Sequence, residues 1–145
     1  MSIPFLACMT AAAAFYHLPP RVLPSIQAVE GGRPGLVHMN VNETADLGVM
    51  QVNTAWIQPL AQYTHMSPDA VTGRLINDSC FNIAAAAAIM RLYLMEAHGD
   101  LLLAVGYYHS HTPTLSAAYQ AKVLAAATTL FLCNRQSPSH AAPPP

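Results

Sequence analysis

The chain has 145 residues, of which 53% are hydrophobic and 9% are charged, and its formal net charge is −1 at pH 7. This length and composition predict one folded domain with a sizeable core and exclude a disordered protein. The near-neutral charge, without a run of basic residues, excludes electrostatic binding to nucleic acid and favours a groove of neutral hydrogen-bonding groups and aromatics that suits a carbohydrate.

Two helices are predicted in the N-terminal part of the chain. The first is rich in alanine and runs from about Pro4 to Phe15, before the Pro19-Pro20 pair that a helix does not continue through. The second begins near Arg21 and ends at Glu30, because paired glycines follow an apolar segment there. Glycine readily takes the left-handed conformation that closes a helix.

Glu30 is therefore predicted to lie in the last turn of the second helix, near unpaired carbonyls and the negative end of the helix dipole. Both disfavour the ionised carboxylate, and apolar neighbours such as Ile26 and Val29 add desolvation. A carboxylic acid that stays protonated near neutral pH is suited to acid catalysis. A solvated surface glutamate fits the same spacing, so the residues alone leave both interpretations open.

Short strands are predicted only between Val37 and Met50, where a turn rich in Asn, Asp and Thr occupies residues 42–46. The pattern beyond this region is helical, and capping residues or a proline in the first turn mark the helix starts. The expected starts are Asn53 or Thr54, Ser67-Pro68, Asp78 or Ser79, Asp100, and Thr112-Pro113.

The longest predicted helix runs from residue 79 to His98, stops at Gly99, and is apolar nearly all round. Such a helix is expected to be buried at the centre of a domain. The end of the chain is rich in proline, serine and alanine. This composition predicts a disordered tail at 136–145 after a single domain at 1–135.

Three short motifs follow one another along the chain. They are Glu30-Gly31-Gly32, Gly48-Val49-Met50-Gln51-Val52-Asn53 and Gly106-Tyr107-Tyr108-His109-Ser110. In this order they resemble the lytic transglycosylase branch of the lysozyme-like superfamily over roughly residues 5 to 125. Its members carry a catalytic Glu followed by Ser or Gly, a Gly-(Leu/Val/Ile)-Met-Gln-(Ile/Val)-Asn signature, and an Ala-Tyr-Asn or Ala-Tyr-His core. The third motif, with Thr112-Pro113 and Tyr119-Gln120 after it, is most similar to those of small transglycosylases attached to secretion and conjugation machines.

The resemblance implies a mainly α, lysozyme-like single domain with a small loop and short-strand region after the catalytic helix. It implies that Glu30 is the catalytic acid and then base, and it supplies four substrate contacts: Gln51, Tyr108, Asn53 and Met50. Spacing alone allows a plainer account of each. Gln51 and Asn53 fit backbone hydrogen bonding in a tight loop, Met50 fits the core or the cleft wall, and Tyr108 fits an ordinary half-buried aromatic.

The resemblance also implies one disulfide. In related secretion-associated transglycosylases, a Cys in the first helix pairs with a Cys in an Asp-x-Cys-x-Asn context. Cys8 occupies the first position and Cys80 the second, so Cys133 is expected to be unpaired. The chain has no Cys-x-x-Cys pair, and zinc or redox roles are therefore not expected.

Several positions depart from the family patterns. Gly31 stands where a Ser is frequent, so another group must position Glu30. Tyr107 replaces the usual Ala and His109 a frequent Asn, and their roles, like that of His111, are left open. The two histidines do not form a metal-binding motif, and we expect neither a metal nor another cofactor.

A second carboxylate decides the reaction type, because a retaining glycosidase needs one about 5–5.5 Å from the acid. The nearby candidates are Glu43 and Asp46, and we expect Asp46 to bind backbone N–H groups in its turn. The resemblance implies instead a lytic transglycosylase, which cleaves the MurNAc–GlcNAc β-1,4 bond of peptidoglycan while the C6 hydroxyl of the substrate forms a 1,6-anhydromuramoyl end. The alternatives are a hydrolase of the same fold and a non-catalytic wall-binding or assembly module.

The expected partners are peptidoglycan glycan strands and components of a secretion, pilus or conjugation apparatus, which places the protein in the periplasm. No segment offers the roughly 18 uninterrupted apolar residues of a membrane span, since Asn82 and Arg91 interrupt the closest one. The N-terminus lacks the pattern of a signal peptide. If the protein is exported, we expect the sequence shown to be a mature form with Met1 added.

Overall fold

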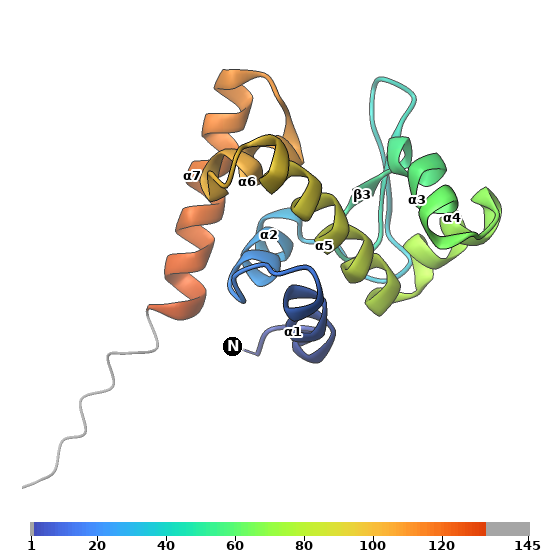
Figure 1. Cartoon of the computed structure of the whole chain (residues 1–145), viewed down its shortest axis with the longest axis horizontal. Helices are drawn as coiled ribbons and strands as arrows, with labels where there is room; N and C mark the ends of the chain where they lie inside the picture. Colours follow the sequence, from blue (N-terminus) through green and yellow to red (C-terminus); the bar gives the residue numbers. More distant parts are fainter. Residues whose placement is uncertain (1, 133–145) are drawn as a thin grey trace, which may run out of the picture.

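The computed structural model describes residues 2–132, which form a mainly helical fold, as predicted (Figure 1). The predicted tail and Cys133 lie outside these residues. The elements of the described part are α1 (Leu6–Phe15), α2 (Val22–Glu30), β1 (Val37–Met39), β2 (Ala45–Leu47), β3 (Val52–Asn53), the 3-10 helix η1 (Thr54–Trp56), α3 (Ile57–Thr64), α4 (Pro68–Asn77), α5 (Ser79–Glu96), α6 (Leu101–His109) and α7 (Pro113–Phe131). None of these helices combines the length and the hydrophobicity needed to cross a bilayer.

Side-chain caps fix the helix starts that the sequence predicts. Ser67 accepts a hydrogen bond from the Ala70 N–H at 3.1 Å. Asp78 accepts one from the Phe81 N–H at 3.0 Å, and Asp100 one from the Leu103 N–H at 3.1 Å. Each cap satisfies an N–H group that has no partner inside its own helix. Helix α1 begins at Leu6, later than predicted, because Phe5 adopts a left-handed φ of 55°.

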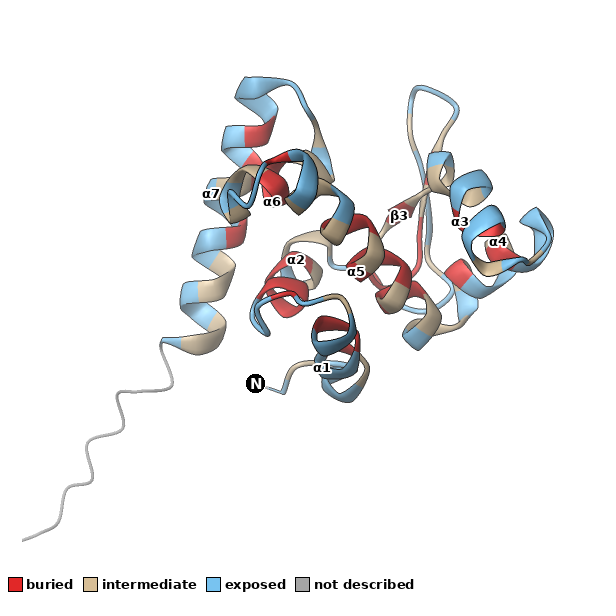
Figure 2. Ribbon diagram, in the orientation of Figure 1, coloured by how far each residue is buried: buried red, intermediate tan, exposed pale blue. Residues whose placement is uncertain are grey.

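Helix α5 is the centre of the fold, and α1, α4 and α6 pack against it (Figures 1 and 2). Its first half is buried, with Ile83, Ala86 and Met90 fully inaccessible. The second half is not, since Leu92 and Met95 are 52% and 62% exposed. The prediction of a helix buried all round is therefore wrong for its last turns. Hydrophobic residues there do not report burial, because apolar atoms contribute much of any protein surface.

The three strands form an antiparallel sheet in the order β1-β2-β3, and the third strand extends beyond the predicted region to Asn53. Asp46 pairs with His38 on one side and with Asn53 on the other. Ala45 and Leu47 are buried. Since side chains alternate across a strand, Asp46 points to the opposite face from the core.

Asn82 ties the loop after β2 to α4 and α5. It is fully buried, and its Oδ1 accepts a hydrogen bond from the Met50 N–H at 2.8 Å. Its Nδ2 donates to the carbonyls of Leu47 and Leu75, both at 2.8 Å. These contacts satisfy three backbone groups that would otherwise be buried without partners.

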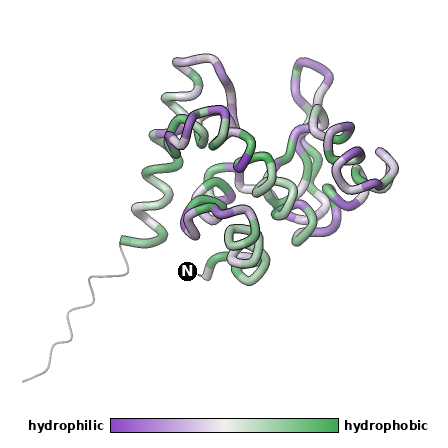
Figure 3. Tube along the Cα trace, in the orientation of Figure 1, coloured by the Kyte–Doolittle hydropathy of each residue, from purple (hydrophilic) through white to green (hydrophobic). Residues whose placement is uncertain are grey.

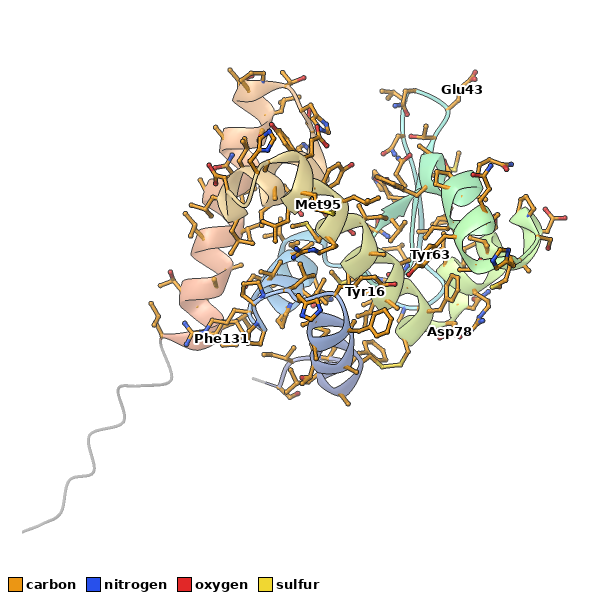
Figure 4. All side chains as sticks on the ribbon, in the orientation of Figure 1. Tyr16, Glu43, Tyr63, Asp78, Met95 and Phe131 are labelled. Atoms are coloured by element: carbon orange, nitrogen blue, oxygen red, sulfur yellow. A yellow bond between two sulfur atoms is a disulfide. The ribbon has the colours of Figure 1, made fainter. Side chains whose placement is uncertain are left out.

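Cys8 and Cys80 are joined by a disulfide, which confirms the predicted pairing and links α1 to the start of α5 (Figure 4, yellow). Their Cα atoms lie 5.3 Å apart, within the usual range for a disulfide. Hydrophobic residues are concentrated in the helices around α5, whereas the β1–β2 hairpin tip and the segment that joins α6 to α7 are hydrophilic (Figure 3).

Candidate active site

Glu30 is the last residue of α2, as predicted, and Gly31 follows it with a left-handed φ of 64°. The Gly31 N–H closes the helix by donating to the Gln27 carbonyl at 2.8 Å. Burial is the main cause that raises the pKa of the Glu30 carboxyl, and the negative charge of Asp46 raises it further. A hydrogen bond from Tyr119 and the positive charge of Lys122 act in the opposite direction on the same pKa.

Tyr119 on α7 positions the Glu30 carboxyl. Its hydroxyl donates to Glu30 Oε1 at 2.7 Å, across a sequence separation of 89 residues. Its ring is buried and stacks on the His109 ring, with centroids 5.0 Å apart. Tyr119 thus supplies a hydroxyl that holds Glu30 in a chain that has Gly31, without a side chain, after the acid. The sequence predicts no role for Tyr119, although the Tyr119-Gln120 pair follows the third motif.

Tyr108 on α6 lies in the same site but has a different partner. Its hydroxyl donates to the Met50 carbonyl at 2.8 Å, and not to Glu30. Burial, followed by the charge of Glu30, raises its pKa well above the ordinary value, so the hydroxyl stays protonated. Tyr108 therefore ties α6 to the loop that carries Gln51.

The first two motifs meet through their backbones. A Cβ atom at Gly32 would collide with the carbonyl oxygens of Gly48 and Val49. Only glycine allows the end of α2 to come this close to the turn before Gln51. The close approach places Glu30 and the second motif on the same wall.

One cavity of about 420 Å³ contains Glu30, Gln51, Tyr108 and Asn53 together. Polar side chains from the β1–β2 hairpin line one side, and the end of α6 lines the other. Four aromatic rings follow one another along its wall: Trp56 contacts Tyr93 edge-on at 5.8 Å, Tyr93 contacts Tyr107 at 6.1 Å, and Tyr107 stacks on His111 at 4.2 Å. Neutral donors and aromatic rings in one cleft are the groups that bind a sugar chain.

The family model of the Transglycosylase SLT domain matches residues 7–125 of this chain. The chain belongs to the SLT transglycosylase family. This confirms the resemblance to lytic transglycosylases and the lysozyme-like fold, and it makes peptidoglycan the substrate of the enzyme. A search of curated proteins finds no match to this chain.

Within the SLT cleft, Gln51 adopts a left-handed φ of 53° and donates from Nε2 to the Gly48 carbonyl at 3.0 Å. A non-glycine residue in this region is uncommon, and such strain is concentrated at functional sites. Gln51 lines the cavity. Gln51 therefore lies where it can contact a bound substrate, and that contact stays a prediction.

Asp46 and Asn53 form a polar network on the same wall. Asn53 Nδ2 donates to Asp46 Oδ1 at 2.9 Å, and Asn40 Nδ2 donates to Asp46 Oδ2 at 3.2 Å. The expectation that Asp46 binds backbone N–H groups is wrong, because its side chain leaves the sheet on the face where these two amides lie. Asn53 also donates to the Thr44 hydroxyl and accepts from the Ala55 N–H. The side chain of Asn53 thus joins β2 and the turn before it to the start of η1.

Met50 does not contact the cleft, and the prediction that it binds substrate is wrong. The residue is fully buried, and it does not line the cavity. Its N–H bonds Asn82 and its carbonyl bonds Tyr108. Met50 lies in the core, and its two backbone hydrogen bonds fix the chain next to Gln51.

The geometry equips Glu30 for proton transfer. When Glu30 is protonated, Oε1 is the carbonyl oxygen that accepts from Tyr119, and the proton lies on Oε2. Donation to a glycosidic oxygen leaves a carboxylate, and the Tyr119 hydrogen bond then becomes charge-assisted and stronger. Burial and Tyr119 shift the pKa in opposite directions, which suits a group that acts first as acid and then as base. Within residues 2–132, no cluster of His, Cys, Asp or Glu could hold a metal ion.

Proposed function

We propose that this SLT transglycosylase cleaves the β-1,4 bond between MurNAc and GlcNAc and releases 1,6-anhydromuramoyl ends. Glu30 protonates the leaving oxygen, and its carboxylate then takes the proton of the substrate's C6 hydroxyl as that oxygen attacks the anomeric carbon. The observation that carries the proposal is the half-buried Glu30, which Tyr119 holds in a cleft with aromatic and amide walls.

A second candidate is a hydrolase of the same fold, which the position of Asp46 favours. Asp46 lines the same cavity as Glu30 and contributes to its raised pKa. The two amides that bond its oxygens join Asp46 to Asn40 and Asn53 of the same wall, and these contacts give it a structural role. We therefore assign Asp46 to the support of the loop.

Mass spectrometry of the muropeptides released from purified peptidoglycan separates the two reactions. An anhydro end is lighter than a reducing end by one water molecule, so the mass identifies the product directly. Anhydro products support the proposal and reducing products support the hydrolase. No products at all would leave a wall-binding module, and Glu30→Gln protein is the matched control for a contaminating enzyme.

We also propose that the enzyme is exported to the periplasm and opens the wall locally for a secretion, pilus or conjugation apparatus. The Cys8–Cys80 disulfide supports export, because structural disulfides persist in oxidising compartments. The third motif supports the association with such an apparatus. The test is a host in which the gene is replaced by the Glu30→Gln allele: its secretion or conjugation efficiency should fall as in a deletion, and an unchanged efficiency would contradict this role.

A further inference from the structure

The ring of Tyr119, whose hydroxyl holds the acid, is covered on one face by His109. The two ring planes are nearly parallel, with an interplanar angle of 9° and centroids 5.0 Å apart. Tyr119 is 4% exposed and does not line the catalytic cleft. His109 is exposed and does line the cleft. The imidazole therefore separates the Tyr119 ring from the cleft.

Close packing of α6 against α7 brings the two rings together. Gly106 has no side chain, and α7 occupies the space beside it: a Cβ atom there would collide with Ser116 Oγ and would also meet Gln120 Nε2. His109 lies three residues after Gly106, and residues at this spacing share one face of a helix. The face of α6 that approaches α7 thus carries His109 at its end, where the ring reaches Tyr119.

This stack has two effects on the hydrogen bond between Tyr119 and Glu30. The bond is 2.7 Å long and its donor sits at the far end of the Tyr119 ring, so a small tilt of the ring would displace it. A parallel ring packed on one face opposes that tilt. The same ring keeps water of the cleft away from the hydroxyl, and a hydrogen bond is stronger where water is excluded.

We propose that His109 is a positioning residue for the acid, an inference that rests on the proposed function of Glu30. Its ring holds the Tyr119 hydroxyl against Glu30 Oε1 and shields this hydrogen bond from solvent. The flat ring of His109 has this role, and not a hydrogen bond from its nitrogen atoms. The rival explanation is that the imidazole bonds the substrate directly.

The first experiment compares two substitutions that keep different properties of the imidazole. His109→Phe keeps a flat ring, whereas His109→Asn keeps a hydrogen-bonding side chain and removes the ring. On soluble glycan strands, His109→Asn should lower kcat by about threefold to tenfold, the range that loss of one aromatic pair allows, and should change KM by less than about twofold. His109→Phe should recover most of the lost rate. The opposite order would show that the imidazole bonds the substrate, and equal losses or no loss in either variant would also overturn the proposal.

The matched control is His98→Asn, the same substitution at an exposed histidine outside the catalytic cleft. His98 has a left-handed φ of 53°, a conformation that asparagine also adopts readily. This variant should keep the wild-type kcat and KM, and circular dichroism should confirm that all variants are folded.

The second experiment asks whether His109 acts through Tyr119. In a Tyr119→Phe background no hydroxyl remains to be held, so His109→Asn should lower kcat further by less than about twofold. Losses that multiply in the double variant would show that His109 acts by another route and would overturn the proposal.

The third experiment needs no catalysis. Tyrosine is labelled with carbon-13 at Cζ, and NMR follows the exchange of the Tyr119 hydroxyl proton with solvent deuterium, with Tyr119→Phe used to assign the signal. Exchange should be faster by about tenfold or more in His109→Asn than in the wild type, and His109→Phe should restore slow exchange. Equal exchange rates in the wild type and both variants would overturn the proposal.

This third measurement fails separately from the proposed function. If the wild-type chain cleaves no glycan but the exchange rates follow the expected order, the proposed reaction is wrong and the contact from His109 through Tyr119 to Glu30 stands. If the chain produces anhydro ends but neither kcat nor exchange responds to His109, the reaction stands and the role of His109 is wrong.

Discussion

Removal of one hydroxyl, by Tyr119→Phe, tests how Glu30 is tuned. The Tyr119 hydrogen bond lowers the pKa of Glu30, whereas burial raises it. Without that bond the pKa of Glu30 should rise, because the charged form loses a stronger hydrogen bond than the protonated form does. A hydrogen bond to a charged group is worth about 1.5–3 kcal/mol, and the half-buried position of Glu30 favours the lower part of this range. The carboxyl also loses the contact that fixes its rotamer.

We expect kcat/KM at pH 7 to fall about tenfold, which corresponds to about 1.4 kcal/mol. The acid step needs protonated Glu30, so the alkaline limb of the pH–rate profile should move to higher pH. The carboxylate that acts as base is formed by that proton transfer itself, so the acidic limb should stay in place. The assay is the release of soluble muropeptides across a pH series, and unfolding in urea checks that the buried ring still packs.

Tyr108→Phe is the informative comparison, because it removes a hydroxyl from the same cleft that bonds the Met50 carbonyl instead of Glu30. It should lower stability and leave the position of both pH limbs unchanged. The reasoning fails if Tyr119→Phe keeps the wild-type profile and rate, or if both variants displace the alkaline limb equally.

Three further variants test the remaining structure. Glu30→Gln should reduce cleavage by about 100- to 10,000-fold. Its urea midpoint at pH 7 should equal or exceed that of the wild type. Folding raises the pKa of Glu30, so the wild-type protein loses stability as the pH rises and this carboxyl ionises. Cys8→Ser opens a loop with a sequence separation of 72 and should cost up to about 4 kcal/mol, seen as a fall in the urea midpoint that reduction of the wild type reproduces. Asn82→Ala should lower the free energy of unfolding by about 3 kcal/mol or more, because it leaves three buried backbone groups without a hydrogen-bond partner. A decrease below about 1 kcal/mol, measured by urea unfolding, would contradict this role.

The sequence predicted those parts of the fold that local chemistry determines. The starts of three helices could be predicted from Ser67, Asp78 and Asp100. Each of these caps bonds an N–H only three residues further along the chain, so the signal is local. Gly31 ends α2 for a similarly local reason, and this places Glu30 correctly. The disulfide partner of Cys8 came from the family resemblance, since three cysteines alone leave the pairing open.

The parts that could not be predicted depend on contacts between distant segments. Tyr119 reaches Glu30 only because α7 packs against α2, and its helical spacing looks the same as that of a core residue. The partners of Asp46 follow from the sheet register, which the turn-rich sequence does not reveal. Met50 was misplaced because the motif describes a segment of chain, and not which of its residues face the cleft.

The backbone contact at Gly32 has a consequence for how the enzyme tolerates change. The separation between the acid and the Gln51 loop is set there by main-chain atoms, so it does not depend on the rotamer of any side chain. Substitutions that loosen the core should therefore lower the melting temperature long before they alter turnover at moderate temperature. A methyl group added at position 32 acts in the reverse way, because it pushes the two segments apart while every residue that lines the cleft stays the same.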